Sequence, residues 1–213
     1  MSSSYCGSGV AVAEPLLEWA TATRLRPGEC VAGDVAVLVP GPTGALIAAA
    51  DGLGHGPAAA RAARVAVREA RLTAQADLAD VARRCHRALR STRGAALSLG
   101  LVVRARESLT WLGVGNVEGR LLRTTSRSRS AHESLVLARG VPGHDLPKLV
   151  PKTIPLRRGD LLIFATDGVA RCFADDLDVT GSTAEIAERI MSRHWKADDD
   201  ALSLVARYLG GAS

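Results

Sequence analysis

Aromatic residues are scarce in this sequence: Phe, Trp and Tyr together make up 3% of its 213 residues, although 47% are apolar. The core therefore has to be built from Ala, Val and Leu. The same scarcity leaves few side chains for base stacking, so nucleic acid is disfavoured as a partner even though the net charge is +5. An acidic or phosphorylated protein partner accounts for the same charge.

Cysteine pairs and long apolar runs are also missing. The four cysteines are widely spaced and form no Cys-x-x-Cys motif, which argues against zinc bound by thiolates. No apolar run approaches the ~20 residues of a membrane-spanning helix. The first residues have neither the basic nor the apolar region of a signal peptide. We therefore expect reduced thiols, a cytoplasmic location and no membrane partner.

The order of the predicted elements indicates the fold class. The length suits one domain over residues 1–213, with an ordered core at about 8–208. Helical periodicity predicts helices at 57–72, 77–89 and 183–194. Apolar runs between turn residues predict strands at 8–13, 16–24, 34–39, 45–50, 95–104, 108–113, 118–124, 151–154, 160–166 and 202–208. Because strands and helices do not alternate regularly, we expect an α+β sandwich with helices covering antiparallel sheets, not a parallel doubly wound sheet.

The predicted helix at 57–72 carries two stripes at steps of three and four residues. One stripe consists of alanines and indicates close packing on a sheet. The other consists of arginines, namely Arg61, Arg64, Arg68 and Arg71. We interpret the arginine stripe as a solvated face, with docking of a partner as the alternative.

The most informative motif is Asp51-Gly52-Leu53-Gly54-His55-Gly56, which follows the apolar run 45–50. A carboxylate at the exit of a strand, followed by glycines that permit close backbone approach, suits a hard cation and a phosphate. A dinucleotide-binding loop is a poor alternative. Its fingerprint has a different glycine spacing, and the carboxylate of Asp51 would repel a pyrophosphate.

Three further acidic motifs lie where an apolar run begins or ends: Gly33-Asp34, Thr166-Asp167-Gly168 and Asp198-Asp199-Asp200. Taken singly, each is typical of a turn or a solvated loop. Taken together with Asp51, they supply the oxygen ligands that Mg²⁺ and Mn²⁺ prefer. Two such ions about 3.5–4 Å apart can share one water and lower its pKa for attack on phosphorus. Gly52 would let its carbonyl turn toward a metal with no side chain in the way.

The joint pattern resembles a known family. These motifs, together with Gly113-Val114-Gly115-Asn116 and Phe164-Ala165-Thr166-Asp167-Gly168, occur in the order found in bacterial metal-dependent protein phosphatases. From about residue 8 to 208 the chain resembles the SpoIIE-type branch of the type 2C serine/threonine phosphatases. Within that branch it is most similar to the compact stressosome phosphatases of the RsbX type. The resemblance implies an αββα sandwich with two Mn²⁺ or Mg²⁺ ions at one end.

The resemblance also implies a role for each candidate residue. Asp51 would bridge both ions, and the carbonyl of Gly52 would bind the first. Asp34 would assist at the first ion, directly or through water, whereas Asp167 and Asp199 would hold the second. The substrate would be phosphoserine or phosphothreonine on a protein, hydrolysed without a phosphoenzyme intermediate. That protein would be a phosphorylated STAS-domain component of a stressosome-type complex in bacterial stress or sigma-factor signalling.

The acidic run before the last strand leaves a choice open. Leu202 stands where relatives commonly carry Ser or Thr after the terminal acidic pair. Asp199 is the preferred ligand, and Asp198 and Asp200 remain alternatives.

Other positions also depart from the family pattern. Some distant relatives use as general acid a His two places after the bridging Asp, where this chain has Leu53. His55 is interpreted as a hydrogen-bonding residue that shapes the loop, with a catalytic part as the alternative. Arg24 and Arg26 are the candidates for a phosphate-binding arginine. A phosphatase-like module that binds phosphorylated partners without turning them over is the alternative function.

Overall fold

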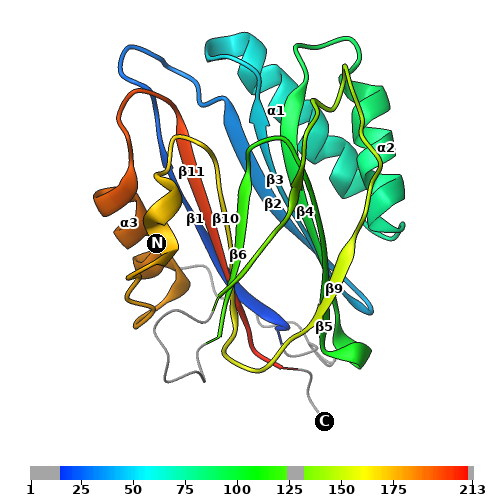
Figure 1. The fold of residues 1–213 in the computed structure, drawn as a ribbon, viewed down its shortest axis with the longest axis vertical. Helices are drawn as coiled ribbons and strands as arrows, with labels where there is room; N and C mark the ends of the chain where they lie inside the picture. The colour runs from blue at the N-terminus through cyan, green and yellow to red at the C-terminus, as the bar shows by residue number, and fades with distance from the viewer. Residues whose placement is uncertain (1–14, 124–131, 211–213) are drawn as a thin grey trace, which may run out of the picture.

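The computed structural model describes residues 15–123 and 132–210, in which two β-sheets pack face to face with helices on their outer faces (Figure 1). The first sheet has the strand order β1 (Leu17–Arg24), β11 (Ala201–Tyr208), β10 (Leu161–Ala165), β6 (Glu118–Leu122) and β7 (His132–Ser134). The second has the order β2 (Asp34–Gly41), β3 (Gly44–Gly52), β4 (Ala95–Val103), β5 (Ser108–Val114) and β8 (Leu137–Ala138), with β9 (Lys152–Pro155) also paired to β5.

The space between the sheets is filled by large side chains that alternate with outward-facing residues. Ile47 and Trp111 of the second sheet meet Phe164 and Leu204 of the first, and all four are buried. Trp111 and Phe164 are among the few aromatic residues of the chain, so these scarce side chains fill the centre. Burial of apolar surface of this kind is the main force that holds two sheets together.

Helices α1 (Gly56–Leu72) and α2 (Leu78–Leu89) cover the outer face of the second sheet. The alanine stripe of α1 is buried against small residues of β3, as predicted: Ala62, Ala63 and Ala66 pack with Ala48 and Ala50. Small side chains on both surfaces let the helix lie close to the strands. Asp77 caps α2 by accepting a hydrogen bond from the Ala79 N–H, at 2.8 Å.

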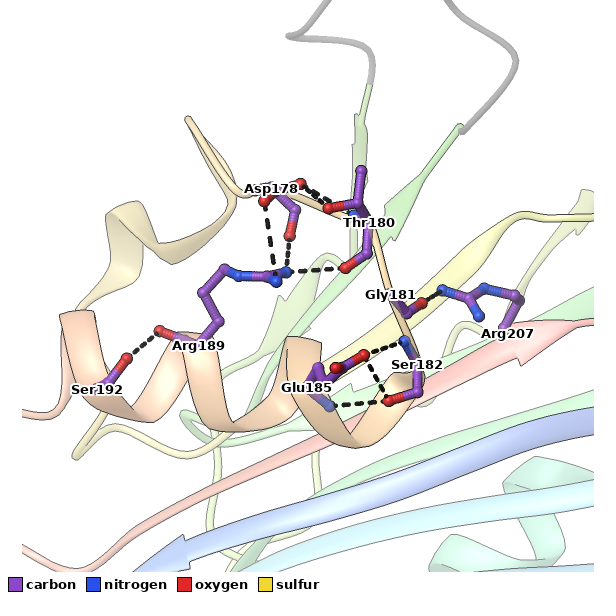
Figure 2. Close-up of polar contacts among 8 residues, drawn as sticks. All are labelled: Asp178, Thr180, Gly181, Ser182, Glu185, Arg189, Ser192 and Arg207. Carbon is purple, nitrogen blue, oxygen red and sulfur yellow. Dashed lines mark hydrogen bonds and ion pairs between the residues drawn. The ribbon is translucent and has the colours of Figure 1, made fainter.

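Helix α3 (Thr183–His194) covers the first sheet, and polar contacts determine where it begins. Ser182 and Glu185 form a reciprocal capping box, and Arg189 reaches back to the Asp178 carbonyl (Figure 2). Arg207 of β11 donates to the Gly181 carbonyl at 2.6 Å, which ties the start of the helix to the sheet. Two short 3-10 helices, η1 (Arg104–Arg106) and η2 (Arg171–Ala174), complete the described elements.

The α+β sandwich predicted from the order of elements is confirmed, and the three helices begin and end within one residue of their predicted bounds. The predicted strand at 8–13 lies outside the described residues. Two short strands, β7 and β8, were not predicted, because each has only two or three residues. The sheets are mainly but not wholly antiparallel, since β8 pairs with β5 in parallel.

No helix in the described residues is long and apolar enough to cross a membrane. The cysteines within residues 15–123 and 132–210 are free thiols: Cys85 is buried, whereas Cys30 and Cys172 are exposed.

Candidate metal centre

Two antiparallel strand pairs, one from each sheet, bring the predicted acidic residues to one edge of the sandwich. Asp34 begins β2 and lies directly opposite Asp51, near the end of β3. Asp167 follows the end of β10, and Asp199 precedes β11, the strand paired with β10. A hydrogen bond joins the two pairs across the sheets, because the Thr166 hydroxyl donates to Asp34 Oδ2 at 2.7 Å.

The pKa of Asp51 depends on its burial and on the charges of the other carboxylates. Burial is the main cause of its raised pKa, which lies at about 9. The charges of Asp34, Asp167 and Asp199 raise this pKa further, whereas a hydrogen bond from Asn116 lowers it. Four acidic groups from distant parts of the chain therefore act on one another at this edge.

Asp34 is the other carboxyl group with a large shift. Burial raises the pKa of Asp34 to about 7, and the hydrogen bond from Thr166 acts in the opposite direction. Charges of Asp200, Asp167 and Asp199 add to the rise. A site in which carboxylates are buried and repel one another favours either a proton or a cation.

Asp167 is held at the exit of β10 by its neighbours. Asn116, in the turn between β5 and β6, donates to Asp167 Oδ2 at 2.7 Å. Lys196 donates to the carbonyl of Asp167 at 2.5 Å. Burial, followed by the charge of Asp199, raises the pKa of the Asp167 carboxyl group. Gly168 is required next to it, since a Cβ there would lie 2.0 Å from the Asp200 carbonyl oxygen.

The structure gives the three consecutive aspartates different environments. Asp200 is buried, and its two carboxylate oxygens accept the N–H groups of Arg26 (2.9 Å) and Gly33 (2.7 Å). Asp200 therefore fastens the segment before β2 to the start of β11. The side chain of Asp199 accepts the Asp200 N–H at 2.9 Å, and its charge acts on the other carboxylates. Asp198 is exposed.

Gly52 allows close packing of α1 against β3, in addition to any metal binding by its carbonyl group. A Cβ at this position would lie 2.0 Å from the carbonyl oxygen of Ala59, in the first turns of α1. The Gly52 N–H donates to the Gly33 carbonyl at 3.1 Å. The glycine thus lets α1 approach the end of β3, which positions the loop that follows Asp51.

The remaining predicted residues surround this edge. His55 Nδ1 lies 2.5 Å from Glu29 Oε1, which ties the glycine loop to the turn after β1. Arg24 forms an ion pair with Glu188 of α3 at 2.5 Å. Arg26 contributes its backbone N–H to Asp200, as described above.

The donor set fits a hard divalent cation, although the side chains would have to turn toward it. Within residues 15–123 and 132–210, no three His, Cys, Asp or Glu side chains are already gathered as a metal-binding group. Two causes keep the carboxylates apart. Their negative charges repel one another, and one oxygen each of Asp34 and Asp167 accepts a hydrogen bond from a neighbouring side chain. The chemistry of the set is nonetheless that of an Mg²⁺ or Mn²⁺ site, because it consists of carboxylate oxygens that repel one another.

Sequence reasoning missed several residues of this edge. Thr166 and Asn116 belong to the same motifs as the candidate ligands, and a polar side chain next to a candidate ligand is a usable signal. The sequence predicts Asp200 only as an alternative ligand, because a hydrogen bond to residues more than 160 positions away leaves no trace in the local pattern. No signal marked Lys196 or Glu29.

A sequence comparison and a comparison of structures agree on what the chain is similar to. The family described as Stage II sporulation protein E (SpoIIE) matches residues 41–210. No curated protein sequence matches the chain. A structure described under "The bacterial stressosome: a modular system that has been adapted to control secondary messenger signaling" is 29% identical, with a TM-score of 0.81, over 90% of this chain and 99% of that one.

Two further structures share the fold at lower identity. RsbX in complex with magnesium is 21% identical, with a TM-score of 0.80, over 90% of this chain and 95% of that one. The catalytic domain of the serine/threonine protein phosphatase PstP, in complex with two manganese ions, is 17% identical, with a TM-score of 0.66, over 91% of this chain and 98% of that one. The architecture is therefore that of the type 2C phosphatases.

Proposed function

The chain belongs to the SpoIIE family, and on that premise we propose that it hydrolyses phosphoserine or phosphothreonine on a protein by means of a metal-activated water. The family and the fold of the chain are those of protein-serine/threonine phosphatases. The observation that supports the proposed chemistry is the meeting of Asp34, Asp51, Asp167 and Asp199 at one edge of the sandwich, where burial and mutual repulsion raise the pKa values of Asp34, Asp51 and Asp167.

Dependence on a divalent cation accompanies this proposal. Asp51 is the candidate for a ligand shared by two Mn²⁺ or Mg²⁺ ions, with Asp34 and the Gly52 carbonyl on one side and Asp167 and Asp199 on the other. When bound, such ions lower the pKa of a coordinated water and neutralise charge on the phosphoryl group.

The chain's own residues position these candidate ligands. Thr166 holds Asp34 through its hydroxyl group, and Asn116 holds Asp167 through its amide. Asp200 joins the loop before β2 to the start of β11, so that ligands from the two sheets keep their relative places. Burial excludes water from Asp34, which strengthens its interaction with any cation.

The proposed substrate is a phosphorylated regulatory protein of the stressosome type, such as a STAS-domain component. The likeness to a structure from a study of the bacterial stressosome, and to RsbX, supports this assignment. In that role the chain acts in bacterial stress or sigma-factor signalling and works in the cytoplasm.

A direct test compares two variants in hydrolysis of p-nitrophenyl phosphate with added Mn²⁺. Asp51→Asn removes the central carboxylate and is expected to lower the rate by at least about 100-fold. Asp198→Asn removes an exposed carboxylate from the same edge and is expected to keep the rate within about twofold. A chelator in excess is expected to abolish activity. Equal rates in the native protein and in Asp51→Asn would instead favour a phosphatase-like binding module.

A further inference from the structure

The positive charge of the chain is concentrated in one layer of the fold. Residues 56–93, which comprise α1, α2 and their connections, contain nine of the 27 basic residues and three of the 22 acidic ones. This layer therefore carries a formal charge of +6, whereas the rest of the chain carries −1. Every basic residue of the layer is an arginine.

On α1 the arginines form one continuous stripe. Arg61, Arg64, Arg68 and Arg71 recur at steps of three and four residues, and all four are exposed. In the part of the chain that the structure describes, none of them forms an ion pair or a side-chain hydrogen bond. The solvated face expected from the sequence is thus a row of uncompensated charges.

Helix α2 lies beside α1 and extends the same surface (Figure 1). Arg83, Arg84, Arg87 and Arg90 are exposed there. Arg83 pairs with Asp80 at 2.6 Å, and the other three have no ionic partner among the described residues. We call the exposed arginines of α1 and α2 together the basic face.

Ion pairs are more frequent among the arginines elsewhere. Six of the thirteen described arginines outside the layer have a carboxylate partner within the chain, as Arg120 has Glu118 and Arg207 has Glu18, whereas one of the nine in the layer does. Arginine is the side chain best suited to bidentate pairing with carboxylates. Most guanidinium groups of the basic face are therefore free to pair with acidic groups of another molecule.

The basic face leads to the candidate metal centre. Helix α1 starts at Gly56, at the end of the glycine motif that begins with Asp51. Arg93, after α2, lies beside that motif, because a Cβ on Gly54 would be 3.0 Å from Arg93 Nη1. A partner whose phosphorylated side chain enters the metal centre would thus pass along the basic face.

We propose that the basic face docks an acidic surface of the phosphoprotein substrate. This inference rests on the proposed phosphatase function and names the chemistry by which that substrate is recognised. Docking of this kind speeds encounter and selects partners, and its effect weakens as salt screens the charges.

The observations favour an acidic protein over the other polyanions. Residues 56–93 contain no Phe, Trp or Tyr, so the face offers no aromatic platform for the bases of a single-stranded nucleic acid. A membrane-surface helix needs an exposed apolar side. Here the apolar residues of α1 and α2 face the sheet instead, with Leu72 the exposed exception.

The helix geometry sets where the acidic residues of a substrate should lie. At 1.5 Å of rise per residue, Arg64 is about 12 Å and Arg71 about 22 Å along α1 from Gly56. An extended peptide covers about 3.3 Å per residue. Acidic residues are therefore expected roughly four to seven positions from the phosphorylated residue.

The test uses two fluorescent phosphoserine peptides that differ only at those four to seven positions on both sides, where one has Glu and the other Gln. We expect the Glu peptide to bind more tightly in fluorescence anisotropy, and to have a higher kcat/KM with Mn²⁺, by about 3- to 10-fold at low salt. Arg64→Glu/Arg68→Glu should abolish this preference. Arg106→Glu/Arg158→Glu, a control with two exposed arginines outside the basic face, should retain it.

Each outcome decides between the two proposals. Hydrolysis of p-nitrophenyl phosphate should be the same in both double variants, which shows that the metal centre is intact. If no phosphoester is hydrolysed at all, the phosphatase proposal fails, while the anisotropy preference still decides docking. Equal binding of the Glu and Gln peptides, or an equal loss in the control variant, would overturn the docking proposal. So would tighter binding of a 20-nucleotide single-stranded DNA than of the Glu peptide at physiological salt.

Discussion

At the scale of the residue, the candidate site consists of acidic side chains whose environment opposes their charge. Asp34 is almost fully buried, and its carboxylate accepts a hydrogen bond from Thr166. Asp51 lies opposite it on the neighbouring strand and has the more strongly raised pKa. Without a cation, each of these carboxyl groups holds its proton to a higher pH in the folded chain than in the unfolded one.

This difference predicts how the metal-free protein responds to pH. The pKa of Asp34 is raised to about 7 and that of Asp51 to about 9, from an ordinary value near 3.8. Between the ordinary and the raised pKa values, the folded state binds more protons than the unfolded state. The free energy of unfolding is therefore expected to fall as pH rises from about 5 to 9. Each unmatched proton contributes about 1.4 kcal/mol per pH unit.

The measurement is the urea midpoint in excess chelator across that pH range. Asp34→Asn removes one of the two titrating groups, and it also removes a charge that raises the pKa of the other group, Asp51. The urea midpoint of this variant should therefore fall less steeply with pH than that of the native protein. Asp198→Asn, at an exposed position, should follow the native curve. A native midpoint that rises over the same range would contradict the expectation.

At the scale of the element, the position of α1 depends on the absence of side chains at the end of β3. Ala62 and Ala66 allow the helix to lie close to the sheet, and Gly52 lets its first turns approach the strand. The loop between β3 and α1 carries the motif that follows Asp51. The position of this loop thus depends both on how α1 packs against the sheet and on the glycines of the loop itself.

Gly52→Ala is therefore expected to displace α1. Its Cβ would meet the Ala59 carbonyl, which is backbone and cannot rotate away. Overpacking of this kind costs typically 1–3 kcal/mol, and phosphatase activity should fall with it. Gly100→Ala on the neighbouring strand β4 is the control, since the nearest atom there, at 3.2 Å, belongs to the flexible end of Leu109. Urea unfolding should show the larger loss of stability for Gly52→Ala.

At the scale of the whole molecule, the candidate ligands come from both sheets. Asp34 and Asp51 belong to the second sheet, and Asp167 and Asp199 adjoin strands of the first. Asp200 and Thr166 make polar links across the same edge. A cation bound there would connect the two layers of the sandwich and would have no equivalent site in the unfolded chain.

Metal binding is accordingly expected to stabilise the fold. At a free Mn²⁺ concentration 100 times the Kd, the gain is about 2.7 kcal/mol per site, and thermal unfolding should shift upward with added metal. Asp167→Ala should unfold cooperatively, like the native protein in chelator, because Asp167 is solvent-accessible, but it should lose most of the shift. Loss of cooperative unfolding in this variant would assign Asp167 a structural role instead.

Local pattern was enough to determine the elements of this protein and the motifs it shares with its family. Periodicities of two and about 3.6 residues are properties of short segments, so the longer strands, the three helices and the buried alanine stripe of α1 were predictable. Asp51 stood out for the same reason, since its glycine neighbours are adjacent in the chain.

Only the tertiary structure distinguished Asp200, which binds backbone N–H groups, from Asp199, whose charge acts on the other carboxylates. It also paired Thr166 with Asp34. It placed the arginines of two helices on one face, where those other than Arg83 have no ionic partner among the described residues. These features depend on contacts between residues far apart in the chain. Such contacts form when the two sheets and their helices pack together, and no short segment carries a record of them.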